Sequence, residues 1–207
     1  MVCIELQKVT KRYGRLRVFR DMTAEVRSGQ VLVLAGRNGS GKSTLLRIVA
    51  GLARPTRGQV VFYQDDRPLG AEERRRLSGL VAVDVAVYGE LTAWENLSFF
   101  SRVRGMRLSP EEGARLLAEV GLAGREDDLA QTYSSGMRQR LKFACCLLHR
   151  PPFLLLDEPG SNLDEAGRAL VERIVAEQRE RGLVVLATNE PREVAYGDVV
   201  LRLEEAP

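Results

Sequence analysis

One short glycine-rich stretch limits what this chain can fold into more than any other part of the sequence. Its glycines allow backbone N–H groups to converge on an anion without obstruction by side chains. Lys42 adds a positive charge for the β and γ phosphates, and the Ser43 hydroxyl can ligate Mg²⁺. We therefore predict a phosphate-binding loop, whose residues in order are Gly36, Arg37, Asn38, Gly39, Ser40, Gly41, Lys42, Ser43 and Thr44.

The residues on either side of this stretch favour nucleotide binding over an ordinary glycine-rich turn. Residues 30–35 (QVLVLA) have the pattern of a buried strand, and residues 42–50 (KSTLLRIVA) have the pattern of a helix. The positive end of that helix would face the phosphates. A strand, a loop and a helix in this order predict an α/β fold with a nucleotide at the loop.

A second apolar run ends in two carboxylates. Residues 153–156 (FLLL) are followed directly by Asp157 and Glu158. A buried parallel strand would deliver both acids to its carboxyl end, where open α/β sheets place their chemistry. One carboxylate can hold Mg²⁺ through water, and the next can orient or deprotonate an attacking water. We assign Asp157, together with Ser43, to the metal, and Glu158 to catalysis.

The other segments complete an α/β fold with a mostly parallel sheet, an antiparallel β-rich N-terminal part and an inserted helical lobe. We expect one domain over residues 1–207, with a core of residues 1–84 and 150–207 and a lobe of residues 88–149. The expected strands cover residues 2–9, 18–26, 59–63, 80–88, 183–187 and 199–203. The expected helices cover residues 72–77, 92–104, 109–120, 134–148 and 165–179.

Composition argues against several classes of protein. The 31 basic and 28 acidic residues leave a net charge of only +3, which does not favour nucleic-acid binding. No run of roughly 18 apolar residues marks a membrane span, and Met1 leads directly into a strand pattern, so we expect a cytoplasmic chain. Cys145 and Cys146 lie in an apolar helix and Cys3 in the first strand, which favours reduced core thiols over metal or redox roles.

Three features leave alternatives open. Ser134, Ser135 and Gly136 precede an apolar helix and can form a second anion site by the same dipole argument. Tyr13 can stack on a purine or be a surface aromatic. A third feature is the aromatic group Trp94, Phe99 and Phe100, which can be the core of the lobe or a patch that faces a partner.

Taken in order, these motifs resemble those of the ATP-binding-cassette (ABC) ATPases over essentially the whole chain. Residues 36–44 resemble the family's phosphate loop, residues 133–137 (YSSGM) its signature motif, residues 154–158 its Walker B strand, and residues 161–164 its D-loop. The resemblance implies a P-loop NTPase fold with ATP and Mg²⁺ as cofactors. It also implies that Tyr13 stacks on adenine, and it counts Val18 among the nucleotide-binding residues.

The resemblance further implies a head-to-tail dimer with two ATPs between the subunits. Ser134, Ser135 and Gly136 of one subunit, with Asp164, would then complete the site on the other. A transmembrane subunit would dock near residues 85–104, on the inner face of the cell membrane. The stretch from Tyr88 to Leu97 resembles exporter cassettes, and the similarity leans towards the haem-exporter ATPase of cytochrome c maturation. Homodimer and heterodimer both remain open.

Two positions depart from the family pattern. Val83 stands where the family has the Q-loop glutamine, and Asn189 stands where it has the switch histidine. We assign Asn189 to catalysis with Lys42 and Glu158, and both departures put the hydrolysis rate in question. The resemblance implies the ATP-hydrolysing motor subunit of a membrane transporter of the exporter type. Two alternatives stay open: a soluble ABC-type ATPase, or an ATP-gated binding module with little hydrolysis.

Overall fold

The computed structural model describes residues 1–161 and 163–204, and internal contacts divide the chain into two compact units. The first unit contains Met1–Leu80, Pro152–Glu158 and the chain from Ile174 onward. The second contains Val81–Pro151 and Pro159–Arg173. The expected lobe, residues 88–149, lies inside the second unit, which also includes residues 81–87, 150–151 and 159–173.

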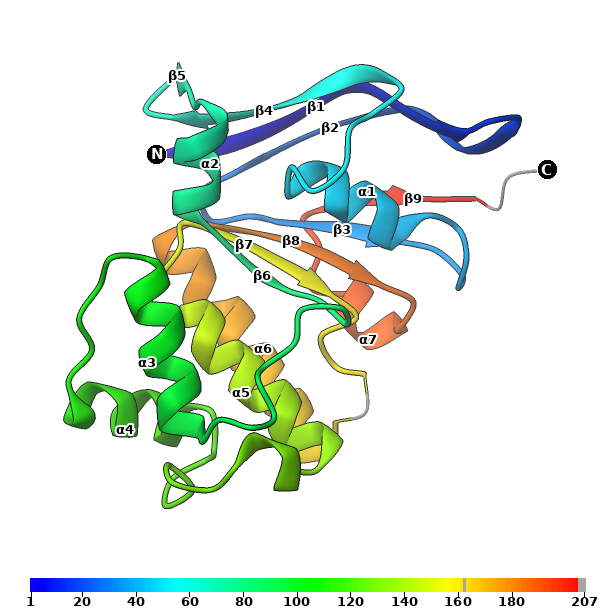
Figure 1. The fold of residues 1–207 in the computed structure, drawn as a ribbon. Helices are drawn as coiled ribbons and strands as arrows, with labels where there is room; N and C mark the ends of the chain where they lie inside the picture. The colour runs from blue at the N-terminus through cyan, green and yellow to red at the C-terminus, as the bar shows by residue number, and fades with distance from the viewer. Residues whose placement is uncertain (162, 205–207) are drawn as a thin grey trace. The chain divides into compact units, whose positions relative to one another are not determined.

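An antiparallel sheet forms one layer of the first unit (Figure 1). Its strands are β1 (Val2–Tyr13), β2 (Leu16–Arg27), β4 (Arg57–Gln64) and β5 (Arg67–Pro68), in the order β2-β1-β4-β5. β1 pairs antiparallel with both β2 and β4. Val2, Ile4 and Leu6 alternate with less buried residues along β1, so one face of the sheet packs on the core.

The second sheet of this unit has the order β6-β7-β8-β3-β9. Its strands are β6 (Ser78–Val81), β7 (Phe153–Asp157), β8 (Leu183–Thr188), β3 (Val31–Ala35) and β9 (Val199–Arg202). β3 pairs parallel with β8 and β9, and β7 pairs parallel with β8. Every residue of β3, β7 and β8 is buried, which explains their continuous apolar sequences. The carboxyl ends of these three strands therefore meet at one edge of the sheet.

Helix α1 (Lys42–Val49) lies between the two sheets of the first unit (Figure 1). Leu45, Leu46 and Ile48 of this helix belong to a buried cluster that also contains residues from both sheets. Phe62 of β4 and Phe153 of β7 join in this cluster, with ring centroids 4.7 Å apart. This shared core fixes the start of α1 against the end of β3.

Among the described residues, the first unit contains three further helical segments. They are α2 (Ala71–Leu77), the short α7 (Pro191–Val194), and the second part of α6 (Glu165–Arg181). Ile174 and Val175 of α6 are buried. The first part of α6 belongs to the second unit.

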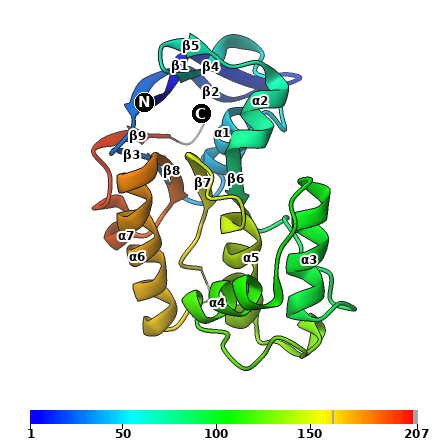
Figure 2. The ribbon, with the colours of Figure 1, turned by 90° about the vertical axis from the view of Figure 1, so that its left-hand side faces the viewer.

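The second unit contains α3 (Ala93–Val103), α4 (Pro110–Glu119), the 3₁₀ turn η1 (Ala130–Thr132) and α5 (Ser135–Leu147), and Figure 2 shows this group of helices from the side. Thr92 and Glu95 form a capping box at α3, and Ser109 caps α4, so both helices begin where the expected ranges 92–104 and 109–120 placed them. Leu97, Leu117 and Leu141 are fully buried, one from each of these α-helices.

The strand predicted over residues 80–88 is wrong beyond Val81. The chain turns there, with Val85 N donating to Ala82 O at 3.2 Å. The carbonyls of Ala82 and Val83 accept hydrogen bonds from Lys142 Nζ at 3.2 and 3.1 Å, so a side chain replaces the neighbouring strand that the apolar sequence suggested. None of the helices formed by the described residues is both long and apolar enough to cross a bilayer.

Candidate functional site

The phosphate loop joins β3 to α1, and its glycines are required by close contacts. A Cβ on Gly36 would lie 2.5 Å from Ser40 Oγ and 2.6 Å from the carbonyl oxygen of Leu203. Gly41 has φ 96° and is the N-cap of α1, and a Cβ on it would lie 2.5 Å from Val18 Cγ1. Val18, expected among the nucleotide-binding residues, therefore lies against the phosphate loop.

Lys42 is in the first turn of α1, and only 5% of its side chain is exposed. Its ammonium donates to the carbonyls of Gly36 and Arg37 at 2.9 and 3.1 Å. It also lies 3.2 Å from Glu158 Oε1. Buried cations need such partners because removing an ammonium from water is costly. The ammonium is thereby held beneath the backbone of the loop.

Ser43 and Asp157 supply neighbouring oxygen atoms at the carboxyl end of β7. Ser43 Oγ donates a hydrogen bond to Asp157 Oδ1 at 3.0 Å, and Asp157 is buried. Hydroxyl and carboxylate oxygens are the ligands that Mg²⁺ prefers. Within the described chain, the buried Ser40 Oγ of the same loop has no hydrogen-bond partner, which fits a loop shaped for a ligand.

Glu158 and Asn189 lie at the ends of the neighbouring strands β7 and β8. Glu158 has a left-handed backbone, with φ 47°, and its N–H donates to Ala187 O at 2.8 Å. Asn189 N donates to Glu158 Oε2 at 3.4 Å, and Asn189 Nδ2 donates to Asn38 Oδ1 at 2.9 Å. Asn189 thus connects the acid of β7 with the phosphate loop. The Asn38 contact was not anticipated, because no pattern links residues so far apart.

Tyr13 lies at the tip of the β1–β2 hairpin and is 55% exposed. Lys11 Nζ lies 4.6 Å from the centroid of its ring. An exposed aromatic ring in this position is available for stacking, so its role at adenine stays a prediction. Arg37 and Gly39 are in the loop and Thr44 is in α1, as expected.

The signature residues are in the second unit, at the start of α5. Ser134 is the N-cap, and its Oγ accepts a hydrogen bond from Met137 N at 3.2 Å. Ser135 and Gly136 form the first turn. Tyr133 is buried, and its hydroxyl donates to Arg125 O at 2.6 Å. Burial, followed by the charge of Asp128, raises the pKa of Tyr133 to about 12.

Asp164 is also in the second unit, and its described contacts are those of a helix cap. Asp164 Oδ1 accepts from Gly167 N at 2.7 Å and pairs with Arg140 at 3.0 Å. The Gly167 N–H and then the Arg140 side chain hold the pKa of this carboxyl below its usual value. Its predicted contact with nucleotide stays a prediction. Asn162 of the same D-loop stretch lies outside the described residues.

Lys142 makes a contact that the sequence did not predict. It lies in α5 and holds the backbone at Val83, the position where the family has glutamine, while the Val83 side chain is 73% exposed. Burial lowers the pKa of Lys142. A lysine in an amphipathic helix is usually solvated, so nothing in its sequence context indicated this contact.

Comparison with known proteins decides the family. Residues 19–161 match the sequence profile of the ABC transporter family. The chain belongs to this family. The structure is also similar to that of the ATP-binding cassette MJ0796, which was solved as a dimer in a post-hydrolysis state bound to ADP and Pi. The TM-score is 0.82 and the sequence identity is 25%, and the similarity covers 97% of this chain and 94% of that one. The predicted family and fold class are confirmed.

Two curated ABC relatives show the range of the similarity. The chain is 34% identical over 90% of its length to the cytochrome c biogenesis ATP-binding export protein CcmA of Haemophilus influenzae, and covers 88% of that protein. It is also 34% identical over 92% of its length to the uncharacterized ABC transporter ATP-binding protein YdbJ of Bacillus subtilis. The chain spans only 62% of YdbJ.

Proposed function

We propose that this chain is the ATP-binding and ATP-hydrolysing subunit of an ABC membrane transporter of the exporter type. One observation carries the proposal. Lys42 and Ser43, adjacent in α1, contact Glu158 and Asp157, adjacent at the end of β7. A buried cation, a hydroxyl and two carboxylates at the end of a phosphate loop are the groups that phosphoryl transfer to water requires.

In this proposal the loop residues bind the phosphates of ATP. Backbone N–H groups from Gly39 to Ser43 and the positive end of α1 would face them, and Lys42 would add its charge. Ser43 and Asp157 are the residues that would hold Mg²⁺, which when bound neutralises phosphate charge. Tyr13 and Val18 would lie on the side of the base.

Glu158 is the group that would orient and deprotonate the attacking water. Its carboxylate is paired with Lys42 in the described structure. Phosphate oxygens would replace the carboxylate as partner of the buried ammonium, and Glu158 would then be free to act on water. Asn189 lies beside Glu158 and would approach the γ-phosphate with its amide N–H.

We infer a single ABC-type nucleotide-binding domain over residues 1–207, acting as a head-to-tail dimer. Its support is the resemblance of the motifs and the dimeric state of the similar cassette with ADP and Pi. Ser134, Ser135 and Gly136, at the positive end of α5, would contact the γ-phosphate held by the other subunit. ATP would hold the two subunits together, and hydrolysis would release them.

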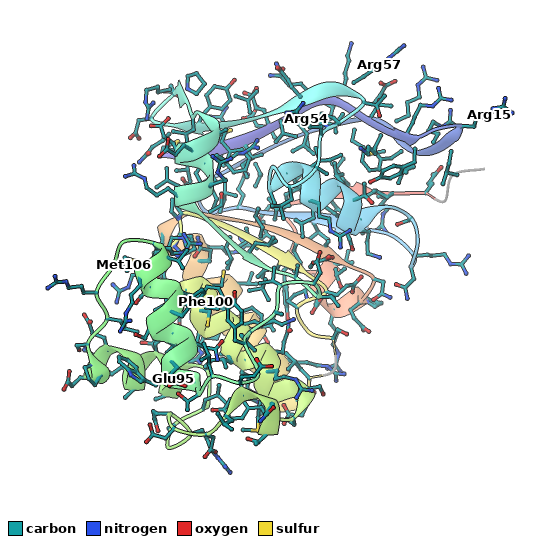
Figure 3. The ribbon with its side chains drawn as sticks, viewed as in Figure 1. Arg15, Arg54, Arg57, Glu95, Phe100 and Met106 are labelled. Carbon is teal, nitrogen blue, oxygen red and sulfur yellow. The ribbon has the colours of Figure 1, made fainter. Side chains whose placement is uncertain are left out.

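Docking to a transmembrane subunit is proposed for residues 85–104. Tyr88, Phe99 and Phe100 form an aromatic cluster there, with centroids 5.0, 5.4 and 6.0 Å apart. Tyr88 and Phe99 are exposed, and Figure 3 labels Phe100 on α3. Exposed aromatic clusters on soluble proteins mark interaction sites.

The chain would then be peripheral to the inner face of the cell membrane. The similarity to CcmA favours an exporter of the cytochrome c maturation type.

A second function, an ATP-gated module that hydrolyses little, is favoured by Val83 and Asn189. The Glu158→Gln variant tests the ATP-bound head-to-tail dimer that both functions share, because the amide keeps the shape of the side chain but cannot take a proton. Light scattering with Mg-ATP should show a doubling of mass for this variant. A monomer at saturating Mg-ATP would contradict the proposed dimer.

A further inference from the structure

A group of arginines surrounds a cavity on the antiparallel sheet of the first unit. The cavity has a volume of about 380 Å³, within the range of small-ligand sites, and its described lining includes Arg12, Arg17, Arg20, Arg57 and Asp21. Thr10 and Thr56 line it as well. A smaller cavity, of about 250 Å³, shares Arg12 and Arg17 and adds Arg15 and Leu16. Figure 3 labels Arg15 and Arg57 around this part of the sheet.

Irregular strand pairing brings these arginines together. β1 shifts register against β2 and again against β4 around residues 6–12, so the regular alternation of side chains is interrupted. Lys8 and Asp21 have left-handed backbones at these irregularities. A Cβ on Gly58 would lie 2.3 Å from Lys8 O, so glycine is what allows β4 to approach β1 so closely. Arg57 is thereby placed opposite Thr10.

The positive charge of this cavity is only partly neutralised. Asp21 is the one acid among the described lining residues, and it is already engaged by Arg20 Nε at 3.0 Å and Thr10 Oγ1 at 3.2 Å. Throughout the described chain, the guanidinium groups of Arg12, Arg17 and Arg57 form no ion pair. Like charges held this close repel one another, so an anionic ligand between them would be stabilised.

The larger cavity lies on the opposite face of the hairpin from Tyr13. Arg12 pairs with Arg17, and the next pair along the hairpin is Tyr13 with Leu16. Neighbouring pairs in a hairpin point to opposite faces. Lys11 contacts the ring of Tyr13, which places Lys11 on the Tyr13 face. The arginines are therefore separate from the side chain expected to stack on adenine.

We propose that this arginine cavity binds a compact molecule with two or more phosphate groups. Guanidinium groups donate paired hydrogen bonds to phosphate oxygens, which lysine cannot do with the same geometry. Three arginines without acidic partners match a ligand with several charged oxygens close together. The ligand is either a soluble oligophosphate or the phosphorylated headgroup of a lipid, and two arms of one experiment distinguish these sources.

The first arm is calorimetric titration of the full chain with inorganic tripolyphosphate while saturating Mg-ADP occupies the phosphate loop. The test variant is Arg12→Gln/Arg17→Gln. The matched control is Arg75→Gln/Arg76→Gln, which removes the same charge from exposed arginines of α2. The second arm measures flotation of the same proteins with phosphatidylcholine vesicles, with and without phosphatidylinositol bisphosphate.

The test variant should bind one of the two probes at least about tenfold more weakly than the wild type, because two charge-assisted contacts are lost, whereas the control should bind normally. ADP affinity should not change in either variant, and neither variant should have a lower thermal midpoint of unfolding than the wild type. The probe that responds identifies the source of the phosphate. Equal binding by the wild type and both variants, an equal loss in both variants, or no binding of either probe by the wild type would overturn the proposal.

Discussion

Asn189 connects the phosphate loop with the acid that follows β7. Its amide donates to Asn38 Oδ1 in the phosphate loop, and its backbone N–H approaches Glu158. Histidine at this position would offer a longer side chain that can become cationic near neutral pH. Asparagine offers only a neutral N–H, which is already used within the protein.

We therefore expect slow hydrolysis by the wild type, with little pH dependence between about pH 6 and 8, where an unperturbed histidine would titrate. Asn189→His should raise turnover about tenfold, equivalent to about 1.4 kcal/mol of transition-state stabilisation. Steady-state phosphate release at saturating Mg-ATP measures this, with Asn189→Ala as control. A histidine variant no faster than the wild type would contradict the expectation that asparagine limits the rate, and an alanine variant as fast as the wild type would remove Asn189 from the proposed mechanism.

At the scale of elements, one buried amide organises the loop that precedes α3. The side chain of Asn96 is fully buried; Oδ1 accepts from Tyr88 N at 2.8 Å, and Nδ2 donates to Tyr88 O at 2.9 Å and Thr92 O at 2.9 Å. Buried backbone groups must be paired, so Asn96 replaces a neighbouring strand for this segment. The aromatic ring of Tyr88 is held next to Phe99 as a result.

Asn96→Ala should lower the free energy of unfolding by about 3 kcal/mol, because several part-buried backbone groups lose their partner at once. Urea denaturation of the variant and of Ser98→Ala, a change in the same helix, measures this effect. A loss no larger than that of Ser98→Ala would show that water or rearranged backbone satisfies these groups.

Sequence patterns predicted best the elements that are specified by their own residues, either through a continuous apolar run or through a cap residue next to the helix. Continuous apolar runs identified β3, β7 and β8, and cap residues identified the start of α3. Residues 82–88 have a similar apolar sequence, but Lys142 and Asn96 take over their backbone groups. Such long-range partners leave no local pattern. The contact between Asn38 and Asn189 was hidden for the same reason, whereas the phosphate loop and the acids after β7 were visible as motifs.

For the molecule as a whole, the proposed transport function needs a surface that transmits the nucleotide state to a membrane partner. The aromatic cluster of Tyr88, Phe99 and Phe100 is the candidate within residues 85–104. Phe99 is 39% exposed, which is more than a core position allows.

Phe99→Asp should leave the stability and the ATPase activity of the isolated chain close to wild type, because the charge would point to solvent. It should reduce the amount of chain recovered with the membrane fraction of its host by about fivefold, since a charge in an apolar interface costs roughly 1 kcal/mol or more. Leu52→Asp, the same kind of change at an exposed apolar residue outside residues 85–104, provides the control. An unfolded Phe99→Asp variant would instead place Phe99 in the core.

In the proposed mechanism Glu158 acts on water at the site where Lys42 binds the phosphates of ATP. Single-turnover phosphate release from wild type and Glu158→Gln, with ATP affinity measured on the same samples, tests this role of Glu158. The variant should keep ATP affinity within about twofold and release phosphate at least about 100-fold more slowly, the usual contribution of a general base. Lys42→Ala, measured alongside, should instead lose ATP affinity. A Glu158→Gln variant that binds ATP and releases phosphate at the wild-type rate would contradict the account.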